Sequence, residues 1–173
     1  ACLVVKNAGD DMRLRVGACG GLCKGGSRFG GTAGNIAYTL SLLGEAPLIV
    51  ASVGRDFDRY ESWLKENGLP CSGLRIIPEE FTAGCYITTD LSDNQITSFN
   101  LGAMKHASRY TFRNTDESAA LAIISPGCTE DMTVYSREFK ALGISYIFDP
   151  GQSIPVLSGD QIAEMITGAR MLI

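Results

Sequence analysis

The residues best suited to binding chemistry are two adjacent glycines and an asparagine, Gly30, Gly31 and Asn35, at the start of a predicted helix. The glycines allow the backbone to approach a ligand closely, because they have no Cβ. The amide of Asn35, in the first turn, offers both a donor and an acceptor to hydroxyl groups. The same residues could instead form a tight turn and a helix cap, with Thr32 as the capping residue. Glycine content alone favours the turn.

The residues after this glycine turn predict a short helix and then a strand. Ile36, Leu40 and Leu43 recur at the spacing of one apolar helix face. Gly44 stands where a left-handed residue commonly follows the end of a helix. Pro47 to Val53 is an almost continuous apolar run. Such a run is typical of a buried strand.

Aromatic residues follow this strand. Phe57, Tyr60 and Leu64 recur at helical spacing, and Gly68 ends the pattern. Trp63 lies beside the stripe. We interpret this aromatic face as core packing rather than as a ligand site.

Composition narrows the class of protein. The chain has 173 residues, of which 45% are hydrophobic and 20% charged, as in an ordinary globular domain. The formal net charge of −4 argues against a nucleic-acid partner. No apolar run reaches the length of a membrane-spanning helix, so no membrane partner is expected. The first residues lack the features of a signal peptide, and we therefore expect a cytoplasmic protein.

The cysteines and the histidine predict no metal site. The chain has six cysteines and one histidine, His106, and only Cys19 and Cys23 are close together in sequence. This spacing makes a poor zinc site. Cys85 and Cys128 lie in or beside strand-like runs and are interpreted as small core residues. We expect all six thiols to be reduced.

Residues 81–99 predict a β-hairpin. Phe81 to Asp90 and Gln95 to Phe99 are rich in strand-forming residues, and Asp93-Asn94 between them is typical of a turn. The exposed edge of such a small sheet could pair with a second copy of the chain.

The last third of the chain alternates between strands and helices. Leu121 to Ile124, Ile144 to Phe148 and Met171 to Ile173 are short apolar runs separated by helical patterns, whereas residues 102–119 form a polar connector. This alternation predicts a parallel sheet with helices on both faces. Ligands bind such sheets beyond the carboxyl ends of the strands. The loop of Asp149 to Gln152 lies at such an end.

The complete pattern around Asn35 is more specific than its glycines. Gly-Gly-x-x-x-Asn-x-Ala, a helix, Leu-Gly, an apolar strand and Gly-x-Asp together resemble the first signature of the ribokinase-like (PfkB) sugar and nucleoside kinases. Within that family the chain is most similar to bacterial adenosine kinases. The similarity runs in order over roughly residues 28–173. Further segments that carry it are Asp56-Phe57, Trp63 to Lys65, Phe81 to Ala83, Thr88 to Asp90, Asn94 to Phe99, Gly102 to Met104 and Phe148 to Gln152.

The resemblance implies an α/β fold of the ribokinase-like type, a three-layer αβα arrangement with a mainly parallel sheet and a small β lid. It implies that residues 1–173 are a single incomplete domain, the N-terminal substrate-binding part, whose C-terminal half is absent. The lid strands would lie within about residues 1–28 and 74–99. Two chains could form a homodimer through these lid strands.

The resemblance also implies an acceptor site for a nucleoside or a sugar. In this family an aspartate after the first strand holds substrate hydroxyls, a role for which Asp11 is slightly favoured over Asp10. Phe99 matches an aromatic position that stacks on adenine, and Gln152 lies near a glutamine that faces the nucleoside. Each residue also has a purely structural alternative. The aspartate could be a solvated turn residue, Phe99 a half-buried sheet residue and Gln152 a turn residue. The implied substrate-binding residues are Asp11, Gly30, Gly31, Asn35, Phe99 and Gln152.

The implied activity is ATP-dependent phosphorylation of an alcohol group, which requires a catalytic base and Mg²⁺. The family takes its base from a Gly-Ala-Gly-Asp type motif, and these 173 residues contain none. We therefore expect no catalytic residue and no metal ligand in this chain. ATP and Mg²⁺ would be bound mostly by the absent C-terminal half, and the chain by itself should be inactive.

Other functions remain as alternatives. The nearest is a sugar kinase of the same family, acting on a substrate like ribose or fructose. A non-catalytic fragment that binds a small molecule is the second. A nicotinamide-dependent oxidoreductase ranks low, because no Gly-x-Gly-x-x-Gly follows a strand and opens a helix.

Overall fold

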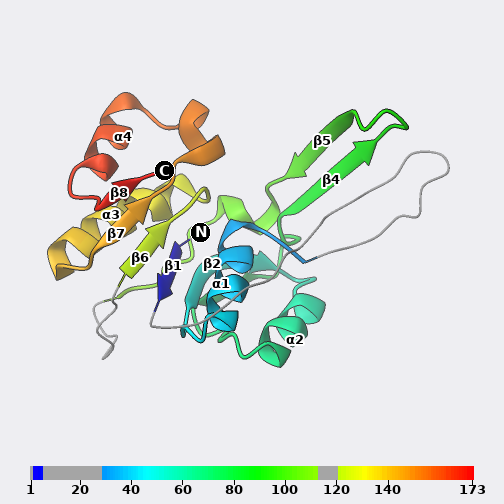
Figure 1. Cartoon of the computed structure of the whole chain (residues 1–173), viewed down its shortest axis with the longest axis horizontal. Coiled ribbons are helices and arrows are strands. Elements are labelled where there is room, and N and C mark those ends of the chain that lie inside the picture. The colour runs from blue at the N-terminus through cyan, green and yellow to red at the C-terminus, as the bar shows by residue number, and fades with distance from the viewer. Residues whose placement is uncertain (1, 6–28, 113–120) are drawn as a thin grey trace.

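The computed structural model describes residues 2–5, 29–112 and 121–173. No helix in these ranges is long and apolar enough to span a membrane. The described residues form two sheets and the surrounding helices shown in Figure 1. In chain order the elements are β1 (Cys2–Val5), α1 (Thr32–Leu42), β2 (Leu48–Gly54), α2 (Asp58–Glu66), β3 (Leu74–Ile77), β4 (Gly84–Thr89), β5 (Gln95–Asn100), η1 (Gly102–Lys105), β6 (Leu121–Ile124), α3 (Thr129–Leu142), β7 (Tyr146–Phe148), η2 (Gly151–Val156), α4 (Gly159–Ile166) and β8 (Met171–Leu172).

The main sheet has six strands in the order β3-β2-β1-β6-β7-β8. β2 pairs in parallel with β3, and β7 pairs in parallel with both β6 and β8. β1 lies at the centre and runs antiparallel to both β2 and β6. The sheet is therefore mainly parallel, as predicted, with one reversed strand in its middle.

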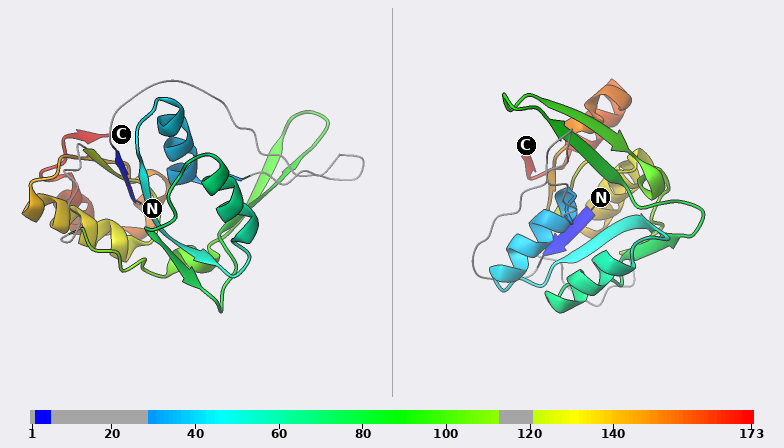
Figure 2. Two further views of the ribbon diagram at one scale, coloured as in Figure 1. Left: turned by 90° about the horizontal axis from the view of Figure 1, so that it is seen from below. Right: turned by 90° about the vertical axis from the view of Figure 1, so that its right-hand side faces the viewer.

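Helices cover both faces of this sheet (Figures 1 and 2). One core cluster joins α1 and α2 to Ile49 and Val53 of β2, and it includes the buried Leu64. The other joins α3 and α4 to Val50 of β2 and to strands β6 and β7, and it includes the buried Phe139. Neighbouring residues of β2 thus serve opposite faces, because side chains alternate along a strand. The predicted three-layer αβα arrangement is confirmed.

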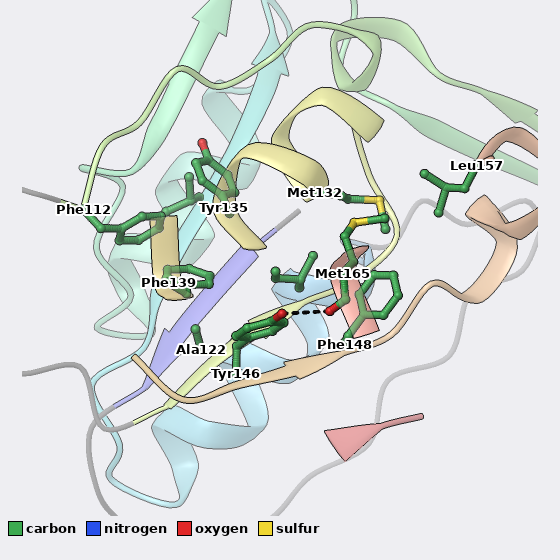
Figure 3. Close-up of a cluster of buried hydrophobic side chains, with 11 residues drawn as sticks. Phe112, Ala122, Met132, Tyr135, Phe139, Tyr146, Phe148, Leu157 and Met165 are labelled. Carbon is green, nitrogen blue, oxygen red and sulfur yellow. Dashed lines mark hydrogen bonds between the residues drawn. The ribbon is translucent and has the colours of Figure 1, made fainter. Parts of the chain in front are cut away.

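The cluster beneath α3 and α4 combines apolar packing with a buried hydrogen bond (Figure 3). Phe139 and Tyr146 are fully buried, with ring centroids 6.0 Å apart. The Tyr146 hydroxyl donates to the main-chain carbonyl of Met165 at 2.8 Å. This bond satisfies the polar end of a tyrosine that otherwise lies among hydrocarbon. It also fixes the end of α4 against β7.

Helix α1 begins differently from the prediction. Its N-cap residue is Gly31, with φ of 94° and ψ of 143°, and no side chain caps it. Thr32 is already the first helical residue, so the prediction that it caps the helix is wrong. The positive φ suits glycine, which has no Cβ to oppose it. At the other end Gly44 has φ of 65°, and the predicted left-handed residue after the helix is confirmed.

The buried face of α1 consists of small residues. Ala33, Gly34 and Ala37 are buried, whereas the predicted apolar face of Ile36, Leu40 and Leu43 is only half-buried. Small side chains let a helix lie close to its neighbours, so the larger ones are displaced to the flank of the contact. The periodicity predicts the helix correctly, and Ile36 and Leu40 do pack against the core cluster, but the centre of the contact is formed by the small residues.

Strands β4 and β5 form a separate antiparallel sheet. Asp90 accepts hydrogen bonds from the main-chain N–H groups of Ser92 and Asn94 at 2.8 Å and 2.9 Å, and Asp93 takes a positive φ of 62°. The predicted hairpin and its turn are therefore confirmed. The range predicted for the lid strands, about 74–99, contains this hairpin. However, β3 within that range belongs to the main sheet.

Two further predictions from the sequence are wrong. Cys85 lies on β4 and is exposed, because the hairpin projects from the domain and offers no core, and Cys128 is only half-buried. The connector after β5 is also less polar than expected, since Ala103 and Phe112 are buried. Phe112 packs with ring centroids 4.7 Å from Phe139, so the connector contributes to the core beneath α3.

Tyr146→Phe should reduce the free energy of unfolding by about 1–3 kcal/mol, because it leaves the buried Met165 carbonyl without its donor. Denaturant unfolding followed by circular dichroism measures the change. Tyr86→Phe is the matched control, since it removes the same hydroxyl from an exposed tyrosine of the hairpin. Its effect should stay within about 0.5 kcal/mol. Equal losses in the two variants would contradict the assigned role of the buried bond.

Candidate functional site

The candidate site lies at one edge of the main sheet. β2, β3, β6 and β7 point in the same direction, so their carboxyl ends share this edge. α1 precedes β2 by a short connection and packs back along it, which brings the first turn of α1 to the same edge. Ligands of open α/β sheets bind at such an edge. The fold therefore brings the glycine turn, Asn35 and the loop of Gln152 to one side of the molecule.

We call Gly30 and Gly31, which precede α1, the glycine turn. A residue of α2 holds this turn at Gly30, whereas the main chain at Gly31 is accessible. The Tyr60 hydroxyl donates to the carbonyl of Gly30 at 2.9 Å. Gly34 lies against the same hydroxyl, and a Cβ there would collide with it. At Gly31, by contrast, a Cβ would meet no atom of the described residues within 4 Å. The main chain at Gly31 is thus accessible, as a ligand contact requires.

An aromatic cluster supports this turn. The rings of Phe29 and Tyr60 stack 4.9 Å apart with an interplanar angle of 9°. The ring centroid of Trp63 lies 5.8 Å from that of Tyr60 and 4.9 Å from that of Tyr38. The predicted core role of the aromatic stripe is confirmed, and the structure adds a polar role for Tyr60. Burial raises the pKa of Tyr60 to about 12, so its hydroxyl keeps the proton that it donates to Gly30.

Asn35 is exposed at the start of α1 and is not packed into the interior. Its main-chain N–H donates to the carbonyl of Gly31 at 2.9 Å, whereas its side-chain amide has no hydrogen-bond partner among the described residues. Asn35, Ile36, Thr39 and Leu40 line an open groove of about 280 Å³. The amide is therefore available to a ligand beside a partly apolar surface.

Phe99 lies near the base of the hairpin, opposite Cys85, and one half of its surface is exposed (50%). Every residue of β5 is exposed, and the covered half of Phe99 lies at the base of the hairpin. The open half of its ring could contact a planar group.

Gln152 is exposed in η2, directly after the carboxyl end of β7. Gly151 before it has φ of 41°, and a Cβ there would approach Pro126 to 2.6 Å. The loops after β6 and β7 are therefore packed together. About 14 Å, or three strand spacings, separates β7 from β2 along this edge.

Asp11 and Asp10, and the lid strands expected within about 1–28, lie outside the described residues. Among the residues that the structure describes, no group of three His, Cys, Asp or Glu side chains could hold a metal ion.

Two residues of the site were not predicted from the sequence as functional. Tyr60 was assigned to the core because its spacing matches an apolar helix face. From the sequence, Asp56 stands only within the Gly-x-Asp and Asp56-Phe57 segments of the family resemblance, without a role, although its carboxylate accepts the main-chain N–H of Thr82 at 2.7 Å. Burial opposes ionisation of Asp56, but its hydrogen bonds with Thr82 outweigh burial and lower its pKa. Its position after Gly54 is the signal that could have directed attention to it.

The family comparison agrees with this arrangement. The model of the pfkB family of carbohydrate kinases matches residues 24–173. The chain belongs to the pfkB family of carbohydrate kinases. The predicted family and its ribokinase-like fold are thereby confirmed.

Individual relatives of this pfkB-family chain are nucleoside kinases. The nucleoside kinase of Methanocaldococcus jannaschii is 33% identical over 147 residues, which make up 83% of this chain and 47% of the relative. The solved nucleoside kinase of Burkholderia thailandensis in complex with inosine has a TM-score of 0.76 and 36% identity, covering 84% of this chain and 47% of that one. Its complex with ADP-inosine has a TM-score of 0.77 and 32% identity, covering 96% and 52%. The chain spans about half the length of the relatives that it matches.

Tyr60→Phe should lower the free energy of unfolding by about 1 kcal/mol, because the Gly30 carbonyl loses its donor. The contribution of Tyr60 also depends on pH. Its pKa is higher in the folded chain, so this contribution is fully present below pH 10 and is lost as the pH rises towards about 12. An alkaline titration of tyrosine absorbance should show a step near pH 12 in the unchanged chain. The buried Tyr146 also has a raised pKa, because burial disfavours its charged form, so the test is the size of the step. The step should shrink by one tyrosine in Tyr60→Phe, and an unchanged size would contradict the assignment.

Proposed function

We propose that this chain binds the acceptor of an ATP-dependent nucleoside kinase. The observation that carries the proposal is the exposed amide of Asn35, without a hydrogen-bond partner in the described residues, beside the open main chain of Gly31. An amide beside accessible backbone suits a ribose, whose neighbouring hydroxyls both donate and accept hydrogen bonds.

The proposed roles follow from the positions of the residues. Gly30 and Gly31 allow the ribose to approach the main chain, and Asn35 hydrogen-bonds to its hydroxyls. Phe99, on the hairpin, stacks on the base. Gln152, in the loop after β7, hydrogen-bonds to a polar edge of the nucleoside. Asp11 remains the proposed second ligand of the hydroxyls, as the family resemblance implies.

A nucleoside is preferred to a free sugar for two reasons. Phe99 presents an exposed aromatic surface, for which a base is a better partner than a sugar. The relatives at 33% and 36% identity are nucleoside kinases, one of them solved with inosine. A purine nucleoside is thus the proposed acceptor, with adenosine as the narrower prediction from the sequence. A sugar such as ribose or fructose is the alternative.

The phosphoryl transfer itself needs groups beyond the described residues. A base must accept the proton of the acceptor hydroxyl, and cations must neutralise the charge on the transferred phosphoryl group. The sequence has no Gly-Ala-Gly-Asp type motif. We therefore propose that this chain orients the acceptor, while ATP and Mg²⁺ are bound mostly by residues outside it. By itself the chain would act as a non-catalytic binding fragment. The homodimer through the hairpin strands stays a prediction.

Calorimetric titration should detect binding of inosine or adenosine, with ribose and fructose weaker. Asn35→Ala should weaken nucleoside binding about tenfold or more, because the ribose hydroxyls lose a hydrogen-bond partner. Ser62→Ala is the control, since it also removes an exposed polar side chain from a helix, away from the glycine turn. It should leave the affinity unchanged.

Two outcomes would overturn this assignment. Equal affinity of Asn35→Ala and the unchanged chain would exclude Asn35 as a ligand of the acceptor. Tighter binding of ribose or fructose than of any nucleoside would select the sugar kinase instead.

The 173-residue chain should transfer no phosphate from ATP to a nucleoside, even with Mg²⁺ present, because it lacks the motif that supplies the base. A coupled assay of ADP release, run with and without inosine, measures this. The chain should still bind inosine in the same buffer. Nucleoside-dependent ADP release would show that the chain contains a catalytic base after all.

A further inference from the structure

The base of the β4–β5 hairpin is fastened to the end of β2 by three hydrogen bonds. The Asp56 carboxylate accepts the main-chain N–H of Thr82 at 2.7 Å, and the Thr82 hydroxyl accepts the N–H of Gly54 at 2.9 Å. The N–H of Arg55 donates to the carbonyl of Glu80 at 2.9 Å. We call this contact between residues 54–56 and 80–82 the hairpin clamp. Of these three hydrogen bonds, only the one to Asp56 involves an ionised side chain, and charge-assisted bonds are the stronger kind. The guanidinium of Arg55 also lies over the Phe81 ring, 4.1 Å from its centroid, and adds a second charged contact to the clamp.

Close backbone packing surrounds the clamp. A Cβ on Gly54 or on Gly102 would collide with the main chain at Phe81 and Thr82. The N–H of Ala103, on the chain leaving the hairpin, donates to the carbonyl of Phe81 at 2.8 Å. The entering and leaving chains are therefore both fixed to the end of β2, and little space is left for them to shift.

Beyond its base the hairpin has little support in the described part of the chain. Every residue of β5 is exposed, and Tyr86 of β4 is exposed as well. Figure 1 shows both strands projecting away from the main sheet. An isolated two-stranded hairpin is marginally stable in water. Within the described part of the chain, the direction of the hairpin, and with it the position of Phe99, is thus set at the clamp.

The same segment also holds the glycine turn. Asp56 contacts the hairpin, and Tyr60, four residues later, donates to Gly30. Phe57 between them is buried in the core, so the segment is fixed relative to the sheet. One short stretch of chain therefore sets the hairpin and the glycine turn at a defined distance from each other.

We propose that Asp56 is a positioning residue, which fixes the hairpin relative to the glycine turn and thereby sets the affinity for the acceptor. This proposal rests on the proposed function, since it assumes that a nucleoside binds between these two parts. Asp56 itself is assigned no contact with the nucleoside. It acts through Thr82 on the placement of Phe99.

Asp56→Ala tests the proposal by two measurements. Hydrogen exchange without ligand should become about tenfold faster or more along residues 82–100, because the base of the hairpin loses a charge-assisted bond. The dissociation constant for inosine should rise by a similar factor. Asp56→Asn should restore both values towards those of the unchanged chain, since its Oδ1 can accept the same N–H.

The matched control is Asp90→Ala at the other end of the hairpin. Asp90 also accepts main-chain N–H groups, from Ser92 and Asn94, but it lies at the tip. Its substitution should speed exchange at the tip alone and leave inosine affinity unchanged. If Asp56→Ala does not fold, Thr82→Ala removes the partner bond to Gly54 and tests the same clamp.

The outcomes separate this proposal from the proposed function. Unchanged hairpin exchange in Asp56→Ala, or faster exchange with unchanged inosine affinity, overturns the positioning role while inosine binding by the unchanged chain stands. Failure of the unchanged chain to bind inosine overturns the proposed function and the claimed effect on affinity together.

Discussion

The chain that leaves the carboxyl end of β2 carries the interactions on which the candidate site depends. Gly54 and Asp56 bond to the base of the hairpin, and Tyr60 bonds to the glycine turn. Phe57 anchors this segment in the core. The base of the hairpin and the glycine turn are thus both bonded to the segment that follows β2. Asn35 and Phe99, the exposed residues of the proposed site, lie on the two parts that this segment holds.

We propose that binding and chemistry are divided in this pfkB-family chain. The described residues include an exposed amide at Asn35, an exposed aromatic ring at Phe99 and open backbone at Gly31. The relatives are about twice as long as the part that this chain matches. On this proposal, acceptor binding by this chain can be measured separately from the transfer of phosphate.

Local signals predicted local structure well. Gly44 and Gly68 adopt the positive φ typical of helix ends, and the Asp93-Asn94 turn connects the expected hairpin. The sequence failed where contacts join distant segments. Nothing in the spacing of Tyr60 shows that its hydroxyl reaches Gly30, thirty positions away. The burial of Ala33 in place of Leu40 likewise depends on how closely α1 approaches its neighbours. The spacing of apolar residues gives no information about that distance.

The reversed strand β1 has a consequence for folding. β2 and β6 do not pair with each other, so β1, four residues long, is the backbone link between the two halves of the main sheet. Each half joins strands that are close in sequence, although each core cluster also includes a residue of the other half, Val50 of β2 in one and Ile123 of β6 in the other. Contacts between neighbouring segments form fast, whereas those that close long loops form slowly. We therefore expect two early-forming subdomains whose union waits for the N-terminal strand to insert between them.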